Sequence, residues 1–158
     1  PRPHQPPKLS FTEVPYRVPD KETESETPEK RFPTTNPIKQ RNVKSVIGYP
    51  TRDSIISHKS HVVIRGVAWD DGHGIQDVMI STDGGKTWDK ALLDDGKLGR
   101  YAYRAFRFAY KPTTFGKVTI MAKAINKIGD EQPFAKDIKW NHGGYKYNGI
   151  DEVTVEVI

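Results

Sequence analysis

The stretch IQDVMISTDGGKTW, residues 75–88, decides the fold class of this chain. Its first seven residues alternate as a half-buried β-strand does, with positions 75, 77 and 79 expected on one face and positions 76, 78 and 80 on the other. Asp83-Gly84-Gly85 is a hairpin turn signal, because the glycines permit positive φ and the Asp83 carboxylate can accept hydrogen bonds from the amides of a tight turn. The stretch therefore predicts a structural β-hairpin, with Trp88 packed back under it and a turn built by Asp83, Gly84, Gly85 and Trp88.

The end of this stretch has a second interpretation. STDGGKTW (81–88) also fits the Asp-box pattern of sialidase-like propeller repeats, which requires several copies at a blade-length period. The sequence contains one copy, and 158 residues are too few for a propeller. The structural hairpin is therefore the favoured interpretation.

Alternating apolar segments recur on both sides of the hairpin, and turn sequences such as DDGHG (70–74) and DDG (94–96) separate them. No amphipathic helix of any length is predicted. About seven short strands at roughly regular spacing are typical of an all-β fold, an immunoglobulin-like antiparallel β-sandwich. The expected strands cover residues 43–47, 61–69, 75–81, 88–93, 103–110, 117–126 and 153–157.

Residues 1–42 differ from the rest in composition. Proline recurs there, and each proline removes a backbone donor and biases its predecessor away from helix. A disordered linker is one interpretation. Isolated apolar residues such as Phe11, Tyr16 and Phe32 favour the other, an extended Pro-rich arm that lies across a neighbouring domain. The predicted organisation is thus an N-terminal arm or connector over residues 1–42 and a β-sandwich over residues 43–158.

Composition argues against several classes of site and partner. The net charge is +5, but the cations are scattered, so a nucleic-acid partner is not expected. The absence of cysteine excludes a disulfide framework, a thiolate zinc site and a cysteine nucleophile. No apolar run approaches the roughly 18 residues of a membrane span. No signal-peptide pattern is present, so a chain that begins Pro1-Arg2-Pro3 is interpreted as a processed or trimmed product.

Few residues have the pattern of a catalytic or metal site. His58 and His61 are the most closely spaced histidines, and no protein-ligated metal site is expected. Arg100, Arg104 and Arg107 alternate with aromatic residues and could stack on nucleic-acid bases. The favoured alternative is a sheet face whose arginines cover aromatic neighbours or form ion pairs. No nucleophile elbow surrounds any serine, so no catalytic residue is predicted.

The segment WNHGGYKYN, residues 140–148, is rich in groups that can bind an anion. It offers the side chains of Asn141, His142 and Lys146 and the backbone amides of Gly143-Gly144.

Several of these segments together, and in this order, resemble the dimerisation domain of molybdenum-cofactor oxidoreductases. The resemblance covers roughly residues 43–158. The segments that carry it are IRGVAW (64–69), IQDV (75–78), STDGGKTW (81–88), AKAIN (122–126), Gly129, QP (132–133), WN (140–141) and GY (144–145). YRVPD (16–20) and NVKSVI (42–47) also resemble the bacterial connector that precedes this domain.

The resemblance implies a sulfite oxidase or sulfite dehydrogenase, in which a separate N-terminal domain binds molybdopterin through a cysteine. Those enzymes oxidise sulfite to sulfate by oxygen-atom transfer and pass electrons to a haem or cytochrome. This chain has no cysteine. It is therefore expected to bind no cofactor alone, to dimerise, to partner a molybdenum-cofactor domain or chain, and to work in the periplasm with a cytochrome as possible acceptor. The alternative is a stand-alone immunoglobulin-like binding module with no redox role.

One substrate-binding position of the family differs in this sequence. In animal and plant relatives the Trp-Asn segment carries an arginine that helps to bind the anionic substrate, and Gly143 stands at the matching position. The resemblance therefore leaves the substrate open between sulfite, another sulfur oxyanion and a different reaction. The candidate anion-binding residues are His142, Lys146 and Arg17.

Overall fold

The computed structural model describes residues 17–19, 35–96, 98–138 and 144–158. The chain divides into two compact units, Pro1–Arg41 with Lys139–Tyr147 and Asn42–Ile138 with Asn148–Ile158. In the first unit, β1 (Arg17–Pro19) and β2 (Thr35–Pro37) pair antiparallel. The extended arm expected over residues 1–42 falls mostly outside the described residues and stays a prediction.

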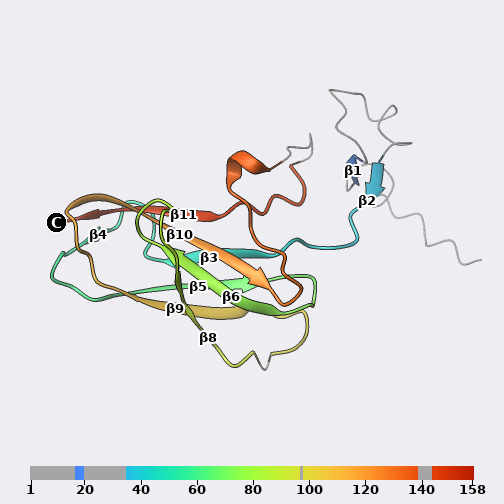
Figure 1. Cartoon of the computed structure of the whole chain (residues 1–158), viewed down its shortest axis with the longest axis horizontal. Coiled ribbons are helices and arrows are strands. Elements are labelled where there is room, and N and C mark those ends of the chain that lie inside the picture. The colour runs from blue at the N-terminus through green and yellow to red at the C-terminus, as the bar shows by residue number, and fades with distance from the viewer. Residues whose placement is uncertain (1–16, 20–34, 97, 139–143) are drawn as a thin grey trace, which may run out of the picture. The chain divides into compact units, whose positions relative to one another are not determined.

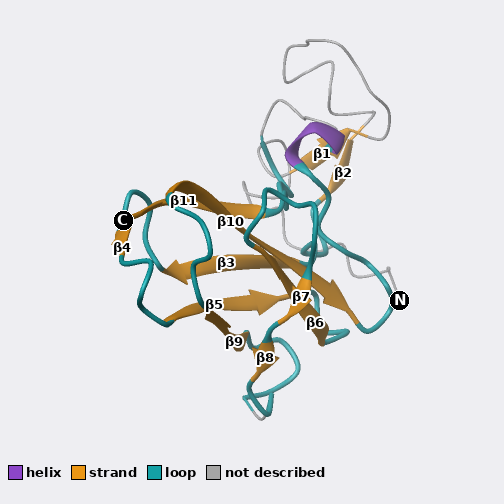
Figure 2. Cartoon of the chain, turned by 60° about the vertical axis from the view of Figure 1, so that its left-hand side comes forward, coloured by secondary structure: helices purple, strands orange, loops and turns teal. Residues whose placement is uncertain are grey.

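The second unit is a sandwich of two sheets, with strand orders β4-β11-β10-β6-β7 and β3-β5-β9-β8 (Figure 1; Figure 2). The predicted all-β, immunoglobulin-like architecture is confirmed, although β4 pairs with β11 in parallel. The described residues contain no α-helix and one short 3₁₀ helix, η2 (Ala135–Asp137). The strands are β3 (Lys44–Tyr49), β4 (Ile55–Ile56), β5 (Val62–Trp69), β6 (Ile75–Ser81), β7 (Asp89–Lys90), β8 (Leu92–Leu93), β9 (Arg104–Tyr110), β10 (Gly116–Asn126) and β11 (Asp151–Val157).

The hydrophobic core lies between the two sheets, because successive side chains of a strand point to opposite faces. In the five-stranded sheet, Ile120 of β10 lies opposite Val153 of β11, and both are buried. In the four-stranded sheet, Gly66 of β5 lies opposite the buried Phe106 of β9. A Cβ atom on Gly66 would overlap both the Phe106 ring and the carbonyl oxygen of Val46, so the sheet requires glycine there.

β6 departs from the regular alternation that its sequence predicts. Ile125 pairs with Asp77 while Asn126 pairs with Ile75, so Gln76 is an extra residue in a β-bulge. The bulge shifts the alternation by one position. Ile75 is therefore buried with Val78, whereas the unbroken pattern placed it on the face of Asp77.

The strand expected over residues 88–93 is divided into two short strands that belong to different sheets. β7 pairs with β6 in one sheet, and β8 pairs with β9 in the other. Between them, the amide of Ala91 donates to the carbonyl of Val78 at 2.8 Å. The chain thus crosses from one sheet to the other along one border of the sandwich.

Candidate interaction surface

The hairpin turn after β6 satisfies its own polar groups. Asp83 accepts hydrogen bonds from the amides of Lys86 (2.9 Å) and Thr87 (3.0 Å) and from the Thr87 hydroxyl (2.6 Å). The side-chain and backbone hydrogen bonds from Thr87 are the main reason that the pKa of Asp83 lies far below its ordinary value. Gly84 and Gly85 adopt φ values of 74° and 87°, which residues with a side chain rarely adopt. The Asp83 carboxylate is thus used inside its own turn.

Trp88 closes this hairpin. Its Nε1 donates to the carbonyl of Gly85 at 3.1 Å, and its ring makes an edge contact with Phe134 at a centroid distance of 6.4 Å. Lys123 Nζ lies 5.1 Å from the Trp88 ring centroid and 3.0 Å from a carboxylate oxygen of Glu131. The indole therefore joins the turn to the outer surface of the five-stranded sheet.

The three candidate anion-binding residues fall in the unit formed by residues 1–41 and 139–147. Arg17 lies in β1 opposite Pro37, and its side chain is outside the described part of the structure. Lys146 is exposed and has a positive φ of 62°. His142 and Gly143 lie outside the described residues. Anion binding by Arg17, His142 and Lys146 thus stays a prediction.

Gln132 forms a buried polar hub. It is 1% exposed, and its Oε1 accepts from the amides of Ser45 (2.7 Å) and Ala124 (2.9 Å) and from the Ser45 hydroxyl (2.6 Å). Its Nε2 donates to the carbonyls of Asn148 (3.2 Å) and Gly149 (2.9 Å). One side chain thus ties β3 of one sheet to β10 of the other and to the chain that enters β11. Sequence reasoning noted Gln132 only within the family resemblance and gave it no role.

The outer edge of β3 is closed by side chains. The amides of Ser45 and Ile47 donate to Gln132 Oε1 and to Asp151 Oδ2, both at 2.7 Å. Asn148 Nδ2 donates to the carbonyl of Val43 at 3.2 Å. Because these groups are satisfied, this edge does not offer the open ladder that strand addition uses. The other edge strands, β4, β7 and β8, contain two residues each.

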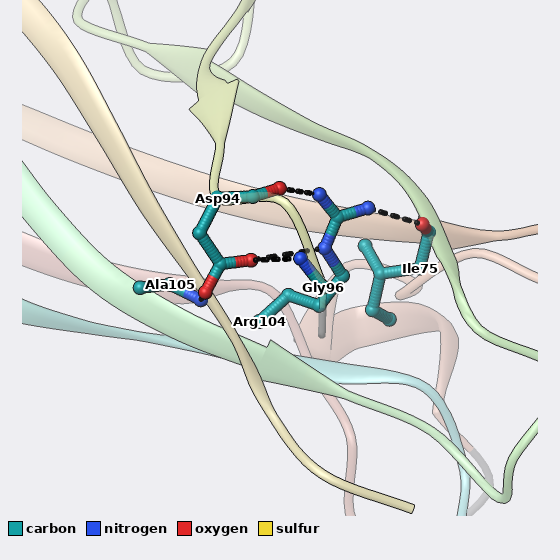
Figure 3. Close-up of polar contacts among 5 residues, drawn as sticks. All are labelled: Ile75, Asp94, Gly96, Arg104 and Ala105. Carbon is teal, nitrogen blue, oxygen red and sulfur yellow. Dashed lines mark hydrogen bonds and ion pairs between the residues drawn. The ribbon is translucent and has the colours of Figure 1, made fainter. Parts of the chain in front are cut away.

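Arg104 anchors the loop between β8 and β9 (Figure 3). Its Nε lies 3.1 Å from Asp94 Oδ1, its NH2 donates to the carbonyl of Asp94, and its NH1 donates to the carbonyl of Ile75 at 3.4 Å. Burial tends to raise the pKa of Asp94, but hydrogen bonds from the amide of Ala105, from Arg104 and from the amide of Gly96 lower it below its ordinary value of 3.8. Arg104 therefore has partners within the chain, which agrees with the ion-pair alternative to base stacking.

The outer surface of the five-stranded sheet carries charges of both signs. Its outward-facing charged residues are Asp77, Glu152 and Glu156 together with Lys90, Lys117 and Lys123. Lys90 Nζ lies 3.0 Å from Asp77 Oδ2, Lys117 lies opposite Glu156, and the hydroxyls of Thr119 and Thr154 are 3.2 Å apart. We call this outer surface the paired-charge face.

The outer surface of the four-stranded sheet is different. None of its four strands contains an acidic residue. At its centre Arg65 of β5 lies opposite Arg107 of β9, and both are exposed. Exposed apolar side chains flank the two arginines: Tyr49 (50% exposed), Val63 (37%) and Leu92 (65%). We call the surface formed by Tyr49, Val63, Arg65, Leu92 and Arg107 the arginine face.

His58 and His61, the most closely spaced histidines, lie in the described part of the chain. No group of three or more His, Cys, Asp or Glu side chains there could hold a metal ion. His58, one of the two closely spaced histidines, stacks on Phe115 at a centroid distance of 4.3 Å. No helix in that part of the chain is long and apolar enough to cross a membrane.

Comparison with known proteins places this geometry in a family. Residues 35–157 match the family model described as the Mo-co oxidoreductase dimerisation domain. Mitochondrial sulfite oxidase of Homo sapiens is 32% identical over 132 residues, which are 80% of this chain and 24% of that protein. The enzyme of Rattus norvegicus is 29% identical over 126 residues, which are 77% of this chain and 23% of that protein. The chain thus spans about a quarter of the length of these relatives.

A solved structure supports the same assignment. The sulfane dehydrogenase SoxCD from Paracoccus pantotrophus superposes with a TM-score of 0.64 at 26% identity, over 77% of this chain and 32% of that chain. The family match covers both sheets of the sandwich, from before β3 to the end of β11. The chain therefore belongs to the family of molybdenum-cofactor oxidoreductase dimerisation domains.

Proposed function

We propose that this chain is the dimerisation and interaction domain, or a separate subunit, of a molybdenum-dependent enzyme that oxidises sulfite or a related sulfur compound. The observation that carries the proposal is the family match over residues 35–157, which includes both sheets. The relatives are named sulfite oxidase and sulfane dehydrogenase, so the proposed substrate class is inorganic sulfur. In this enzyme sulfite would be converted to sulfate, with electrons passed to a cytochrome in the periplasm.

The residues of this chain do not fit molybdopterin binding in the manner that the resemblance implies. That manner requires a thiolate ligand, and the sequence contains no cysteine. We therefore place the cofactor on a separate domain or polypeptide. The described residues offer instead a sandwich of two sheets with one closed edge, which suits a scaffold that holds partners.

The proposed contribution of this chain to the substrate is positive charge. Lys146, His142 and Arg17 belong to one compact unit by their place in the chain, and the net charge of the chain is +5. In the assembled enzyme, Lys146→Ala is expected to raise KM for sulfite by roughly 10-fold or more, because a charge-assisted hydrogen bond contributes about 1.5–3 kcal/mol. Lys90→Ala, on the paired-charge face, is the matched control, and its KM should not change. An unchanged KM in Lys146→Ala would remove Lys146 from the anion site.

A single purification tests the main proposal. The chain is isolated from its native source under mild conditions, and the intact mass of every polypeptide, the molybdenum content and the mass of the assembly are measured. The expected result is stoichiometric molybdenum in a dimeric assembly that contains either a second polypeptide or a longer chain that includes this sequence. A monomer of 17.9 kDa without molybdenum would instead support the stand-alone binding module.

A further inference from the structure

The centre of the arginine face has an unfavourable arrangement of charge. Arg65 and Arg107 are directly opposite residues of an antiparallel pair, where like charges destabilise a sheet. Within the described residues, neither guanidinium has an ion pair or a hydrogen bond, although both are exposed. Two adjacent arginines without acceptors can bind carboxylates in the bidentate geometry that guanidinium groups favour.

The surface on both sides of this arginine pair is hollowed and mainly apolar. A hollow of about 490 Å³ lies toward β8 and includes Leu92, Leu93 and Ala105 in its lining. A second hollow, of about 390 Å³, lies toward β3 and includes Tyr49 and His61. Val63 and Arg65 line both hollows, so the charged centre and its apolar flanks form one surface. Arginine and tyrosine beside apolar pockets are typical of the central residues of protein interfaces.

No carboxylate of this surface is available to neutralise the arginines. The four strands contain no acidic residue. Asp94, which lines the larger hollow, accepts at Oδ1 from Arg104 and Gly96 and at Oδ2 from the amide of Ala105. Within the described residues, both guanidinium groups are therefore left without an acceptor.

We propose that the arginine face is a docking surface for a separate partner protein that presents two neighbouring carboxylates flanked by apolar side chains. The carboxylates pair with Arg65 and Arg107, and the apolar side chains enter the hollows beside Leu92 and Tyr49. This partner is additional to the dimer of the proposed function, and the inference rests on this face alone.

Two other occupants fit less well. A second copy docked by the same face around a two-fold axis would bring four guanidinium groups together, with Asp94 already engaged. A nucleic acid would require a row of cations along its phosphates, whereas the two arginines lie between apolar hollows.

A peptide probe tests the proposal on the full chain. A soluble peptide with two adjacent glutamates flanked by leucines is titrated into the isotope-labelled chain, and the amide and arginine Nε–Hε resonances are followed by NMR. The expected dissociation constant is on the order of 10⁻⁴ M, as for a small charged and apolar contact. Replacement of the glutamates by glutamine, or of the leucines by serine, should weaken binding at least 10-fold.

Variants locate the binding. The double variant Arg65→Gln/Arg107→Gln should bind the peptide at least 10-fold more weakly, whereas Lys90→Gln on the paired-charge face should bind it as the parent does. Unchanged binding by the double variant would overturn the proposal. A short DNA duplex that shifts the same resonances and binds as tightly as the peptide, or more tightly, would overturn it in favour of a nucleic acid.

Self-association is measured in parallel by sedimentation. If the double variant changes the monomer–dimer equilibrium and leaves peptide binding intact, the face belongs to the dimer and the proposal is wrong. Absence of molybdenum or of a dimer in the native assembly would contradict the proposed function but leave the peptide result unaffected. The two failures are therefore distinguishable.

Discussion

The two outer faces of the sandwich are both built on β-sheets, but their charges are arranged differently. The paired-charge face presents three acidic and three basic residues, and Lys90 Nζ lies 3.0 Å from Asp77 Oδ2 there. The strands of the arginine face hold no acidic residue and place Arg65 opposite Arg107. On the first face Lys90 and Lys123 form ion pairs within the chain, whereas on the second neither arginine has one among the described residues. A candidate binding surface is therefore indicated by charged groups that lack an ion-pair partner, such as Arg65 and Arg107, rather than by the number of charges.

The largest effect is expected at the residue that holds the two faces together. Gln132→Leu removes the acceptor of the Ser45 and Ala124 amides and the donor to the carbonyls of Asn148 and Gly149. Because several buried polar groups lose their partner at once, unfolding should become easier by about 3–5 kcal/mol. Urea denaturation followed by circular dichroism measures this difference.

The matched variant of this prediction is Gln132→Glu, which keeps the acceptor oxygen Oε1 but replaces the amide donor Nε2 by a second oxygen. It should also destabilise the sandwich, because a buried carboxylate replaces a neutral amide. A Gln132→Leu protein as stable as its parent would show that the hub does not hold the sheets together. The two sheets would then be held together mainly by the hydrophobic core between them.

Two arginines on one strand provide the next test. Arg104 bonds to Asp94 and to the carbonyl of Ile75, so Arg104→Met should lower the free energy of unfolding by roughly 1–3 kcal/mol. Arg107 has no partner among the described residues, so Arg107→Met should stay within about 0.5 kcal/mol of the parent. Thermal melting of both variants compares them directly, and equal losses would contradict the division into structural and binding arginines.

Acid should weaken the loop that Arg104 anchors. The pKa of Asp94 is lower in the folded state than its ordinary value of 3.8. The ionised carboxylate therefore stabilises the fold above about pH 3.8, and this contribution is lost as the pH falls below 3.8 through the folded-state pKa. Urea midpoints of the parent and of Asp94→Asn between pH 7 and pH 2.5 test this. The difference in urea midpoint between the parent and Asp94→Asn should shrink in acid. The corresponding change in unfolding free energy should be smaller than the effect of Arg104→Met. A difference that stays constant with pH would contradict a stabilising role for the ionised Asp94 carboxylate.

The sequence predicts the elements whose signals are local. The hairpin between β6 and β7 follows from Asp83 and its two glycines, and most strands follow from alternation over five or more residues. The bulge at Gln76 escapes such reasoning because it depends on the pairing of β6 with β10, about 45 residues later in the chain. The division of residues 88–93 between two sheets also depends on tertiary packing, because Ala91 bonds to Val78 only once both sheets are in place.

The arginine face could be predicted only in part. The absence of acidic residues from β3, β5, β8 and β9 is visible in the sequence. The opposition of Arg65 and Arg107 is not, because it depends on the register between two separate strands, and a slip of one residue would turn one of them inward. Gln132 likewise has no local signal, since its four partner residues come from three separate segments of the chain.

The smallest expected effects are those of charge reversal, and they compare the two outer faces directly. Arg107→Glu places a carboxylate opposite Arg65, so a repulsive cross-strand pair becomes attractive and the chain should gain about 0.2–1 kcal/mol. Lys90→Glu on the other face replaces a cation that lies 3.0 Å from Asp77 by an anion, and the chain should lose a similar amount. Chemical denaturation at low salt measures both changes, and added salt should reduce both because the charges are exposed. A gain of stability in Arg107→Glu together with a loss in Lys90→Glu would show that charges are favourably paired on the paired-charge face but not on the arginine face. A loss of stability in Arg107→Glu would instead mean that Arg107 stabilises the fold and is not reserved for binding.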